Sequence, residues 1–420
     1  MPMSEPATIH RQRWTIFAVL ALMYILVYFY RVSLAVVAGD ITRDLGLTPQ
    51  QLGSLSGILF YVYAAAQIPL GPMIDRLGSR LVISASGLLT AAGGVLFSQA
   101  TTLAAAMAAR VLIGIGTACV LMATFTVFSH WFSKQEFGRV SGLMVAVGNL
   151  GNLAGTAPLA LAVAAVGWRS SFLTIGIVQI VVTLLVFGMV RDRPPVAAAE
   201  SPLTRDESAC SMMAAWGDIF GNRDFWFLGI IAFAWYGNYL ALQGLWGGPY
   251  LMDVLGLTRG ETGRVLMFTS LGFIAGSMVT DTVARRYFRS YKRTLLAGQL
   301  VLGLLMTGFL GWIELLSRPL LMAVFFVIGL AVSSGVMIYP IIRSMFPVRI
   351  VGTALTSLNF FVLLGAATTQ QVMGVIVGHY PKVGELLSPA ACHAAFLLPV
   401  LTLAAAVLLY LPAGEYGDLR

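Results

Sequence analysis

Long, unbroken runs of apolar residues constrain this chain more than any other feature of its sequence. Twelve such runs, most of them about 20 residues or longer, follow one another from near the first residue to near the last. Lipid offers a backbone no hydrogen-bond partners, so only α-helices and closed β-barrels can cross a bilayer. The runs lack the alternation of apolar and polar residues that marks a barrel strand, and they therefore predict transmembrane α-helices.

The sequence thus predicts an all-α, polytopic membrane protein with twelve transmembrane helices in two pseudo-symmetric six-helix bundles. The expected spans are residues 14–39, 51–74, 80–98, 103–127, 138–163, 169–190, 224–249, 261–284, 294–314, 319–342, 351–379 and 391–411.

Composition supports a lipid-facing surface. Hydrophobic residues make up 58% of the 420 residues and charged residues only 10%, whereas a soluble domain is about 25% charged. The three cysteines, Cys119, Cys210 and Cys392, are scattered, so they predict neither a disulfide framework nor a metal site. No cofactor is expected.

A polar stretch rich in proline and charge begins at Arg191, after the sixth run. It reads as a linker between two halves. We expect an N-terminal six-helix bundle at residues 1–190, a cytoplasmic linker at 191–223 and a C-terminal six-helix bundle at 224–420.

The basic residues predict the orientation. With the N-terminus inside, eighteen Lys and Arg residues fall on the cytoplasmic side and six outside, which leaves two within helices. Cytoplasmic loops carry an excess of basic residues. Both termini are therefore expected in the cytoplasm, most simply with the chain in a bacterial inner membrane. The net charge of +8 then reflects topology, and no nucleic-acid partner is expected.

The two arginines within helices are Arg31 and Arg110. Arg31 shares one face of the first span with Tyr24 and Tyr28, and no Asp or Glu lies at its depth. An ionised residue in a membrane marks a functional site by default, and a guanidinium binds carboxylates or phosphates through two hydrogen bonds. A transported anion is thus the expected counter-ion. The alternative is a side chain that snorkels to the interface.

Arg110 begins the fourth span on its outer half. It could pair with backbone carbonyls, with Asp40 or with Asp44. We expect a structural or gating role for it rather than contact with a substrate.

The seventh span carries Tyr236, Tyr239 and Gln243 at helical spacing, with Asn238 beside them. Hydrogen-bonding side chains on the first helix of the second half would face Arg31 across a central cavity. Buried amides require partners, although each residue could equally serve helix packing. Candidates from other spans are Tyr61, Gln67, Asn149, Asn152, Tyr339 and Asn359.

The loop after the second span contains Gly71, Asp75, Arg76, Gly78 and Arg80. This pattern resembles the G-x-x-x-D-R-x-G-x-R loop of the major facilitator superfamily at the position where that family carries it. The resemblance implies a gating salt bridge for Asp75 and its basic neighbours. The alternative is that these charges only set the topology.

Two further motifs carry the resemblance over nearly the whole chain. Residues Arg110 to Gly114 are similar to the family's R-x-x-x-G pattern in the fourth span. The segment from Tyr28 to Val37 resembles the first helix of the anion:cation symporter and organophosphate antiporter branches, which carry a substrate-facing arginine there. The antiporters are expected to place a second arginine in the seventh span. Here that span has no basic residue from Phe225 to Gly248, which favours a monoanionic carboxylate.

These features predict a secondary transporter of a small organic anion that works by alternating access. The substrate-binding candidates are Arg31, Tyr28, Tyr61, Tyr236, Asn238, Tyr239, Gln243 and Asn359. A monomer is expected, with a proton or sodium as the coupling ion, although a facilitator or an anion exchanger fits equally. A transporter-like sensor, or a carrier of a neutral peptide or sugar, would also fit the sequence. The sequence contains no nucleotide-binding loop or metal cluster that would suggest an enzyme.

Overall fold

The computed structural model describes residues 7–132, 134–194, 212–381 and 386–416, with some side chains inside helices left out. These residues are almost entirely helical, and no β-strand occurs among them. Capping residues explain where several helices begin. Thr48 and Thr258 each form a capping box, with Gln51 and Glu261 respectively, which satisfies backbone N–H groups that a helix start would leave unpaired.

The helices have the following bounds: α1 Ala7–Val32, α2 Leu34–Leu45, α3 Pro49–Leu77, α4 Ser79–Ser98, α5 Leu103–Ala118, α6 Val120–Trp131, α7 Lys134–Ala154, α8 Ala157–Met189, α9 Met212–Phe220, α10 Arg223–Ala241, η2 Leu242–Trp246, α11 Gly247–Pro249, η3 Tyr250–Val254, α12 Arg259–Val283, η4 Ala284–Phe288, α13 Tyr291–Met306, η5 Thr307–Leu310, η6 Trp312–Leu315, α14 Arg318–Ser333, η7 Ser334–Met337, α15 Ile338–Met345, α16 Val348–Gly378 and α17 Pro389–Tyr410.

The prediction of twelve membrane-spanning helices is confirmed. Among the described residues, ten helical stretches are long and apolar enough to cross a membrane. One of them, Gly142–Met189, covers two predicted spans, because Gly167 leaves the helical conformation with φ 79° and breaks α8 between them. The stretches do not include α3, which supplies the remaining span as a helix of 29 residues.

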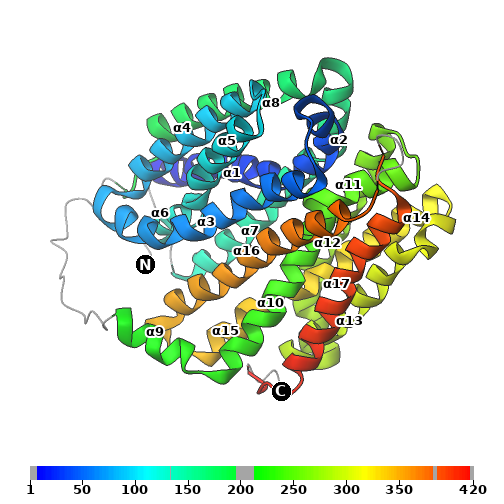
Figure 1. The fold of residues 1–420 in the computed structure, drawn as a ribbon. Helices are drawn as coiled ribbons and strands as arrows, with labels where there is room; N and C mark the ends of the chain where they lie inside the picture. Colours follow the sequence, from blue (N-terminus) through cyan, green and yellow to red (C-terminus); the bar gives the residue numbers. More distant parts are fainter. Residues whose placement is uncertain (1–6, 133, 195–211, 382–385, 417–420) are drawn as a thin grey trace.

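The chain forms two groups of helices, α1–α8 and α10–α17, which lie beside each other (Figure 1). Helices α3 and α16 make the most extensive contact between the groups. The predicted linker at 191–223 contains helix α9, which was not predicted from sequence. The helix is only 9 residues long, so it gives little periodic signal. The predicted domain boundaries remain a prediction.

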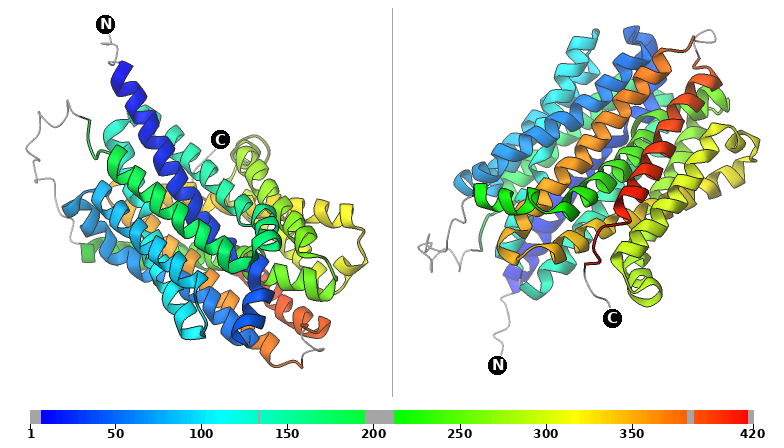
Figure 2. Two further views of the ribbon diagram at one scale, coloured as in Figure 1. Left: turned by 90° about the horizontal axis from the view of Figure 1, so that it is seen from above. Right: turned by 60° about the horizontal axis from the view of Figure 1, so that its bottom comes forward.

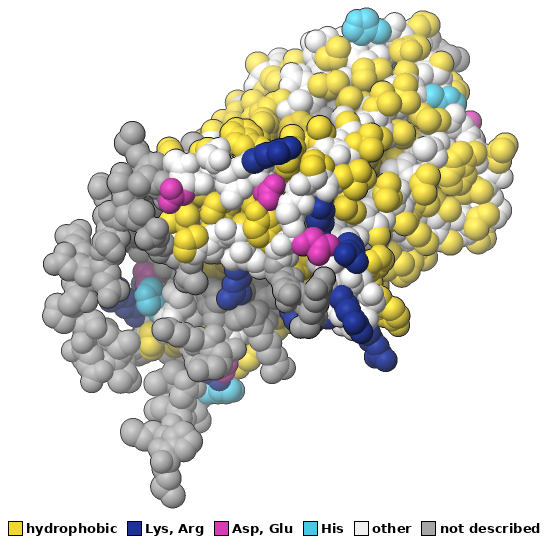
Figure 3. All heavy atoms as spheres, turned by 90° about the horizontal axis from the view of Figure 1, so that it is seen from below, with side chains coloured by type: hydrophobic (Ala, Val, Ile, Leu, Met, Phe, Trp, Pro, Cys, Tyr) yellow, Lys and Arg dark blue, Asp and Glu magenta, His cyan; other side chains and the backbone are white. Residues whose placement is uncertain are grey.

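Both chain termini lie at the same end of the molecule (Figure 2, right). We call this the terminal end and the opposite one the distal end. Large apolar side chains are exposed along the helices between the two ends, for example Leu161 at 67%, Leu184 at 60% and Leu304 at 69%. Hydrophobic side chains cover most of the face in Figure 3, whereas its Lys, Arg, Asp and Glu side chains gather in one zone. This surface suits a lipid environment.

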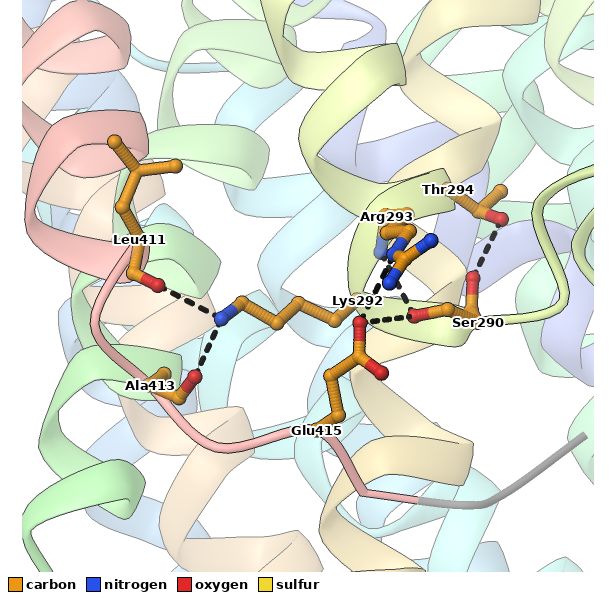
Figure 4. Close-up of polar contacts among 7 residues, drawn as sticks. All are labelled: Ser290, Lys292, Arg293, Thr294, Leu411, Ala413 and Glu415. Carbon is orange, nitrogen blue, oxygen red and sulfur yellow. Dashed lines mark hydrogen bonds and ion pairs between the residues drawn. The ribbon is translucent and has the colours of Figure 1, made fainter.

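The last described residues are fastened to the terminal end (Figure 4). Lys292 donates hydrogen bonds to the carbonyl oxygens of Leu411, at 2.7 Å, and of Ala413. Arg293 contacts Glu415 at 3.0 Å. Tyr416 donates to Asp224 at 2.6 Å, and this hydrogen bond is the main reason that the pKa of Tyr416 rises to about 12. The C-terminal segment thereby ties α13 to α10.

The two halves close tightly at the distal end. A Cβ atom on Gly248 would collide with the carbonyl oxygen of Ala35, so only glycine permits this approach of α11 to α2. Every residue from Phe29 to Ala38 is buried, as is every residue from Gly237 to Leu251. Beside this contact, Arg259 of α12 and Asp40 of α2 form an ion pair across the halves at 2.5 Å.

Candidate functional site

Arg31 lies in the last turn of α1, just before the chain changes direction at Ser33 and continues as α2. The amide of Ser33 still bonds to the carbonyl of Phe29 at 3.0 Å, so the first span bends there without separating. The Arg31 side chain is only 7% exposed. It therefore lies inside the helix bundle, and the interfacial snorkelling considered from sequence does not occur.

Four residues form what we call the Arg31 cluster: Arg31, Tyr28, Tyr63 and Tyr236. The Nη1 atom of Arg31 donates to the hydroxyl of Tyr236 at 3.2 Å, and Nη2 donates to the hydroxyl of Tyr63 at 2.9 Å. The guanidinium carbon also lies 4.7 Å from the ring centre of Tyr28 and 5.0 Å from that of Tyr63. Because Tyr236 belongs to α10, the cluster joins the two halves of the chain.

One side chain at the border of this cluster is accessible to solvent. Tyr339, on α15, lies close enough to interact electrostatically with Arg31, Tyr28 and Tyr236, yet it is 38% exposed. Tyr28 and Tyr236 are half-buried as well. The distal side of the cluster is sealed by the buried stretches of α2 and η2, so access to Tyr339 is from the terminal side.

The carboxylates that the structure describes all lie near the two ends of the molecule, away from Arg31. At the distal end, for example, Asp44 accepts from Trp168 at 2.9 Å, and Glu314 accepts from Tyr250 at 3.1 Å. The full set is Asp40, Asp44, Asp253, Glu261 and Glu314 at the distal end, and Glu136, Asp192, Asp218, Asp224, Asp281 and Glu415 at the terminal end.

Arg110 occupies a different environment. It is 1% exposed and donates to three backbone carbonyls: Nε to Leu55 at 3.2 Å, Nη1 to Tyr30 at 3.1 Å and Nη2 to Ser56 at 3.3 Å. Of the partners considered from sequence, the structure thus selects carbonyls, while Asp40 and Asp44 pair with Arg259 and Arg169. The Arg110 side chain ties α5 to α1 and α3.

Two predicted candidates bridge the halves along the contact between α3 and α16. The hydroxyl of Tyr61 donates to Oε1 of Gln371 at 2.9 Å. Nearer the terminal end, Nδ2 of Asn359 donates to Oε1 of Gln67 at 3.3 Å. All four side chains are half-buried, so they border the interface that any relative movement of the halves must rearrange.

Two predicted candidates on the seventh span, Asn238 and Gln243, lie away from Arg31, whereas a third, Tyr239, lies beside the Arg31 cluster with its ring centre 6.0 Å from that of Tyr236. Asn238 bonds to Thr402 of α17 at 3.0 Å, and Gln243 bonds to Ser270 of α12 at 3.1 Å. Tyr239 stacks on Phe273 with ring centres 5.6 Å apart. These contacts stay within the second half. Helical spacing does not separate these side chains from Tyr236, because α10 is buried on more than one face.

The loop after α3 places Gly78 at φ 83°, a left-handed conformation that suits glycine. The backbone N–H of Arg80 donates to Asp192 at 2.7 Å, and its Nε donates to the carbonyl of Phe187 at 2.8 Å. The side chains of Gly71, Asp75 and Arg76, in the last two turns of α3, lie outside the described residues. The gating salt bridge of Asp75 remains a prediction.

Sequence reasoning missed Tyr63. It lies two residues after Tyr61, on the opposite face of α3, and residues at that spacing do not share a helix face. Both tyrosines have polar partners because α3 lies between the other helices of the first half and α16. The pair of tyrosines on a helix adjoining the first span was the available signal.

Comparison with known proteins identifies the family. A family model described as "Major Facilitator Superfamily" matches residues 20–368, which is most of the chain. The chain belongs to this superfamily of membrane transporters, so it is a multi-pass transport protein and not an enzyme.

Similar proteins carry names that refer to organic anions. A "Probable sulfoacetate transporter" of Cupriavidus necator is 32% identical over 68% of this chain and 67% of its own length. A "Probable L-galactonate transporter" of Escherichia coli K12 is 28% identical over 61% of this chain and 59% of its own. The "Hexuronate transporter" of Bacillus subtilis is 25% identical over 62% and 63%, respectively. The alignments therefore span about three fifths to two thirds of these relatives.

Solved structures share the fold. A D-xylose–proton symporter superimposes with a TM-score of 0.76 at 13% identity, covering 97% of this chain and 98% of its own. A bacterial homologue of the human lysosomal transporter Spinster, solved inward-facing and unoccupied, superimposes with a TM-score of 0.71 at 17% identity, covering 96% and 95%. At these identities the likeness concerns the fold alone.

Proposed function

We propose that this protein is a secondary transporter of a small organic monoanion, most simply a carboxylate, and that Arg31 binds the anionic group. The observation that carries the proposal is the set of partners around Arg31. Its guanidinium is buried at the meeting point of the two halves, and its partners are neutral tyrosine hydroxyls and rings. A buried charge is stable only when it is paired, and an anionic substrate supplies the pair.

One observation favours a single negative charge on the substrate. The second buried arginine, Arg110, already donates to three carbonyls and has little capacity left for a ligand. A further buried arginine, Arg13, pairs with Glu136 at 3.3 Å. Of the three buried arginines in the described part of the chain, Arg31 is then the one that remains for a ligand. The names of the sulfoacetate, galactonate and hexuronate relatives support an organic anion as the substrate class.

Tyr28, Tyr63, Tyr236 and Tyr339 would complete the binding site. Their hydroxyl groups can donate to or accept from the substrate, and their rings contact its carbon skeleton. The residues bridging α3 and α16, including Tyr61 and Asn359, would border the path. In this proposal the two halves, at residues 1–190 and 224–420, move relative to each other around the Arg31 cluster.

The terminal end would face the cytoplasm. The excess of basic residues in the loops of that end carries this proposal, and a bacterial inner membrane is the matching location. In the conformation described, the distal end is closed and Tyr339 is accessible from the cytoplasmic side.

The test compares binding and transport in wild type and three variants at one position. The purified protein is screened by thermal shift against carboxylates, sulfonates, phosphate esters, sugars and dipeptides, and the stabilising compounds are measured for uptake into proteoliposomes. We expect carboxylates to stabilise the wild type, and both effects to disappear in Arg31→Ala and Arg31→Gln. Arg31→Lys, which keeps the charge but loses the planar fork, should retain weakened binding.

Size-exclusion profiles and circular dichroism of the variants serve as the folding control. A sugar or dipeptide that stabilises Arg31→Ala as strongly as wild type would refute the anion site. Binding of carboxylates without any uptake would instead favour the transporter-like sensor.

A further inference from the structure

We propose that the protein is an obligate anion exchanger, in which the empty carrier cannot change sides and an anion must be bound for each passage. This inference rests on the proposed function and specifies its coupling. The sequence left three kinds of coupling open: a proton or sodium ion, facilitation and anion exchange. The inference selects anion exchange.

The empty site carries a net charge. The titratable groups that interact with Arg31 are Tyr24, Tyr28, Tyr63 and Tyr236, with Tyr339 and the thiol of Cys119 at the border of the cluster. Phenols and a buried thiol are neutral at physiological pH. The empty cluster therefore carries one positive charge, and the Nε atom of Arg31 has no hydrogen-bond partner.

Carboxylates are placed too far away to neutralise this charge. Those that the structure describes lie near the ends of the molecule, and several are paired there, as Asp44 is with Arg169 and Glu415 with Arg293. No Asp or Glu occurs between Glu5 and Asp40, a stretch that includes the whole of α1. A carboxylate that faced Arg31 could neutralise it in the empty state and release it on protonation. The described core contains no such group.

The charge becomes costly during the passage between conformations. Alternating access requires a state in which both ends are closed around the site. In that state water no longer solvates Arg31, and the energy of a charge in a poorly polarisable environment rises steeply. A bound monoanion cancels the charge through a bidentate pair. The loaded carrier can therefore close, whereas the empty carrier meets an electrostatic barrier.

Asp40 is the strongest rival to this mechanism. Its ion pair with Arg259 joins the halves at the distal end, so protonation of Asp40 could in principle couple a proton gradient to opening. The pair lies on a different part of the first span from Arg31, beyond the bend at Ser33. The variant Asp40→Asn separates the two mechanisms.

The experiment measures uptake into proteoliposomes that are either empty or preloaded. The labelled probes are glycolate, L-galactonate and sulfoacetate, and the same unlabelled compound is the internal anion. We expect internal anion to accelerate uptake tenfold or more, and neither an imposed pH gradient nor a sodium gradient to replace it. Equal uptake into empty vesicles, driven by either gradient and lost in Asp40→Asn, would overturn the exchange mechanism and leave the anion site standing. No flux of any probe under any condition would contradict the proposed function itself.

A second measurement tests the electrostatic cause without using flux. Tyr236→Glu places a carboxylate on the position that now bonds to Arg31, and Tyr236→Gln is the uncharged control of the same size. Labelling of Ala38→Cys, at a buried position of α2 beside the distal contact, reports opening of the distal end in a background without native cysteines. Without substrate, we expect Tyr236→Glu to raise the labelling rate at least tenfold over Tyr236→Gln. Equal rates would exclude the unpaired charge as the barrier.

Discussion

Two arginines buried in one core illustrate how local partners decide the role of a residue. Arg110 donates to three carbonyls and Arg31 to two hydroxyls. The carbonyls belong to α1 and α3, so Arg110 fastens helices to one another. The hydroxyls are neutral and do not compensate the charge of Arg31, which is why we propose this residue as the one that binds an anion.

The two arginines should therefore respond oppositely to the same substitution. Arg110→Gln loses most of three hydrogen bonds, each of which contributes about 0.5–1.5 kcal/mol, so the free energy of unfolding should fall by about 2 kcal/mol. Arg31→Gln removes an unpaired charge and should change stability by less than about 1 kcal/mol. Thermal unfolding in detergent measures both. A larger loss of stability for Arg31→Gln than for Arg110→Gln would show that Arg31, and not Arg110, has the structural role.

Sequence reasoning found Arg31 because depth in an apolar helix and the absence of nearby acids are both visible in the chain. It could not choose among the polar residues around it. Gln243 satisfied the same helical spacing as Tyr236, and Asn238 was chosen because it lies beside them, yet the two amides bond to α12 and α17. A helix at the centre of a bundle is buried on every side, so spacing alone does not identify the face that meets the site.

Among the helices, α2 and α11 approach each other closely across the halves, where Gly248 lies against Ala35. The apolar runs located the helices of the first and seventh spans well. They did not predict the bend at Ser33 or the π-helical turns at Leu242 and Tyr250. Such changes in helix geometry depend on packing across the interface, which a single apolar run does not encode.

Gly248→Ala should prevent the distal end from closing. The added methyl group meets backbone rather than a mobile side chain, so α2 and α11 must separate to accommodate it. We expect uptake into proteoliposomes to fall at least tenfold, while the protein stays folded and its distal end becomes more accessible to thiol reagents. Gly260→Ala is the matched control, because a Cβ at Gly260 meets nothing within 4 Å. Normal uptake by Gly248→Ala would show that the contact is not needed for transport.

The two ends of the molecule differ, because the halves pack closely against each other at the distal end. Twelve spans, an apolar perimeter and termini on the same side follow from length and hydropathy, and these features were predictable from sequence. Which end is closed was not predictable, since it depends on contacts between residues far apart in the chain, such as Asp40 with Arg259.

Tyr339 provides a test of this asymmetry, because it is 38% exposed beside a buried cluster. Tyr339→Cys, in a background without the native cysteines, should react with a membrane-impermeant maleimide added from the terminal side. A bound anion should slow the reaction at least threefold by covering the position. The labelling rates from the two sides of the membrane are compared by adding the reagent to everted vesicles and to intact cells. Faster labelling from the distal side would contradict the proposal that Tyr339 is reached from the terminal side.

Because of the ion pair between Asp40 and Arg259, we expect the protein to respond differently to the salt concentration on the two faces of the membrane. The side chains of Arg259 and Asp40 are 29% and 15% exposed, so mobile ions can screen their attraction, over a Debye length of about 10 Å at 0.1 M. Ionic strength on the distal face then loosens the seal between the halves, whereas the same salt on the terminal face does not reach it. In the proposed orientation the distal face is the outer one, so a change in external salinity would alter the opening rate of the carrier while the cytoplasm stayed constant.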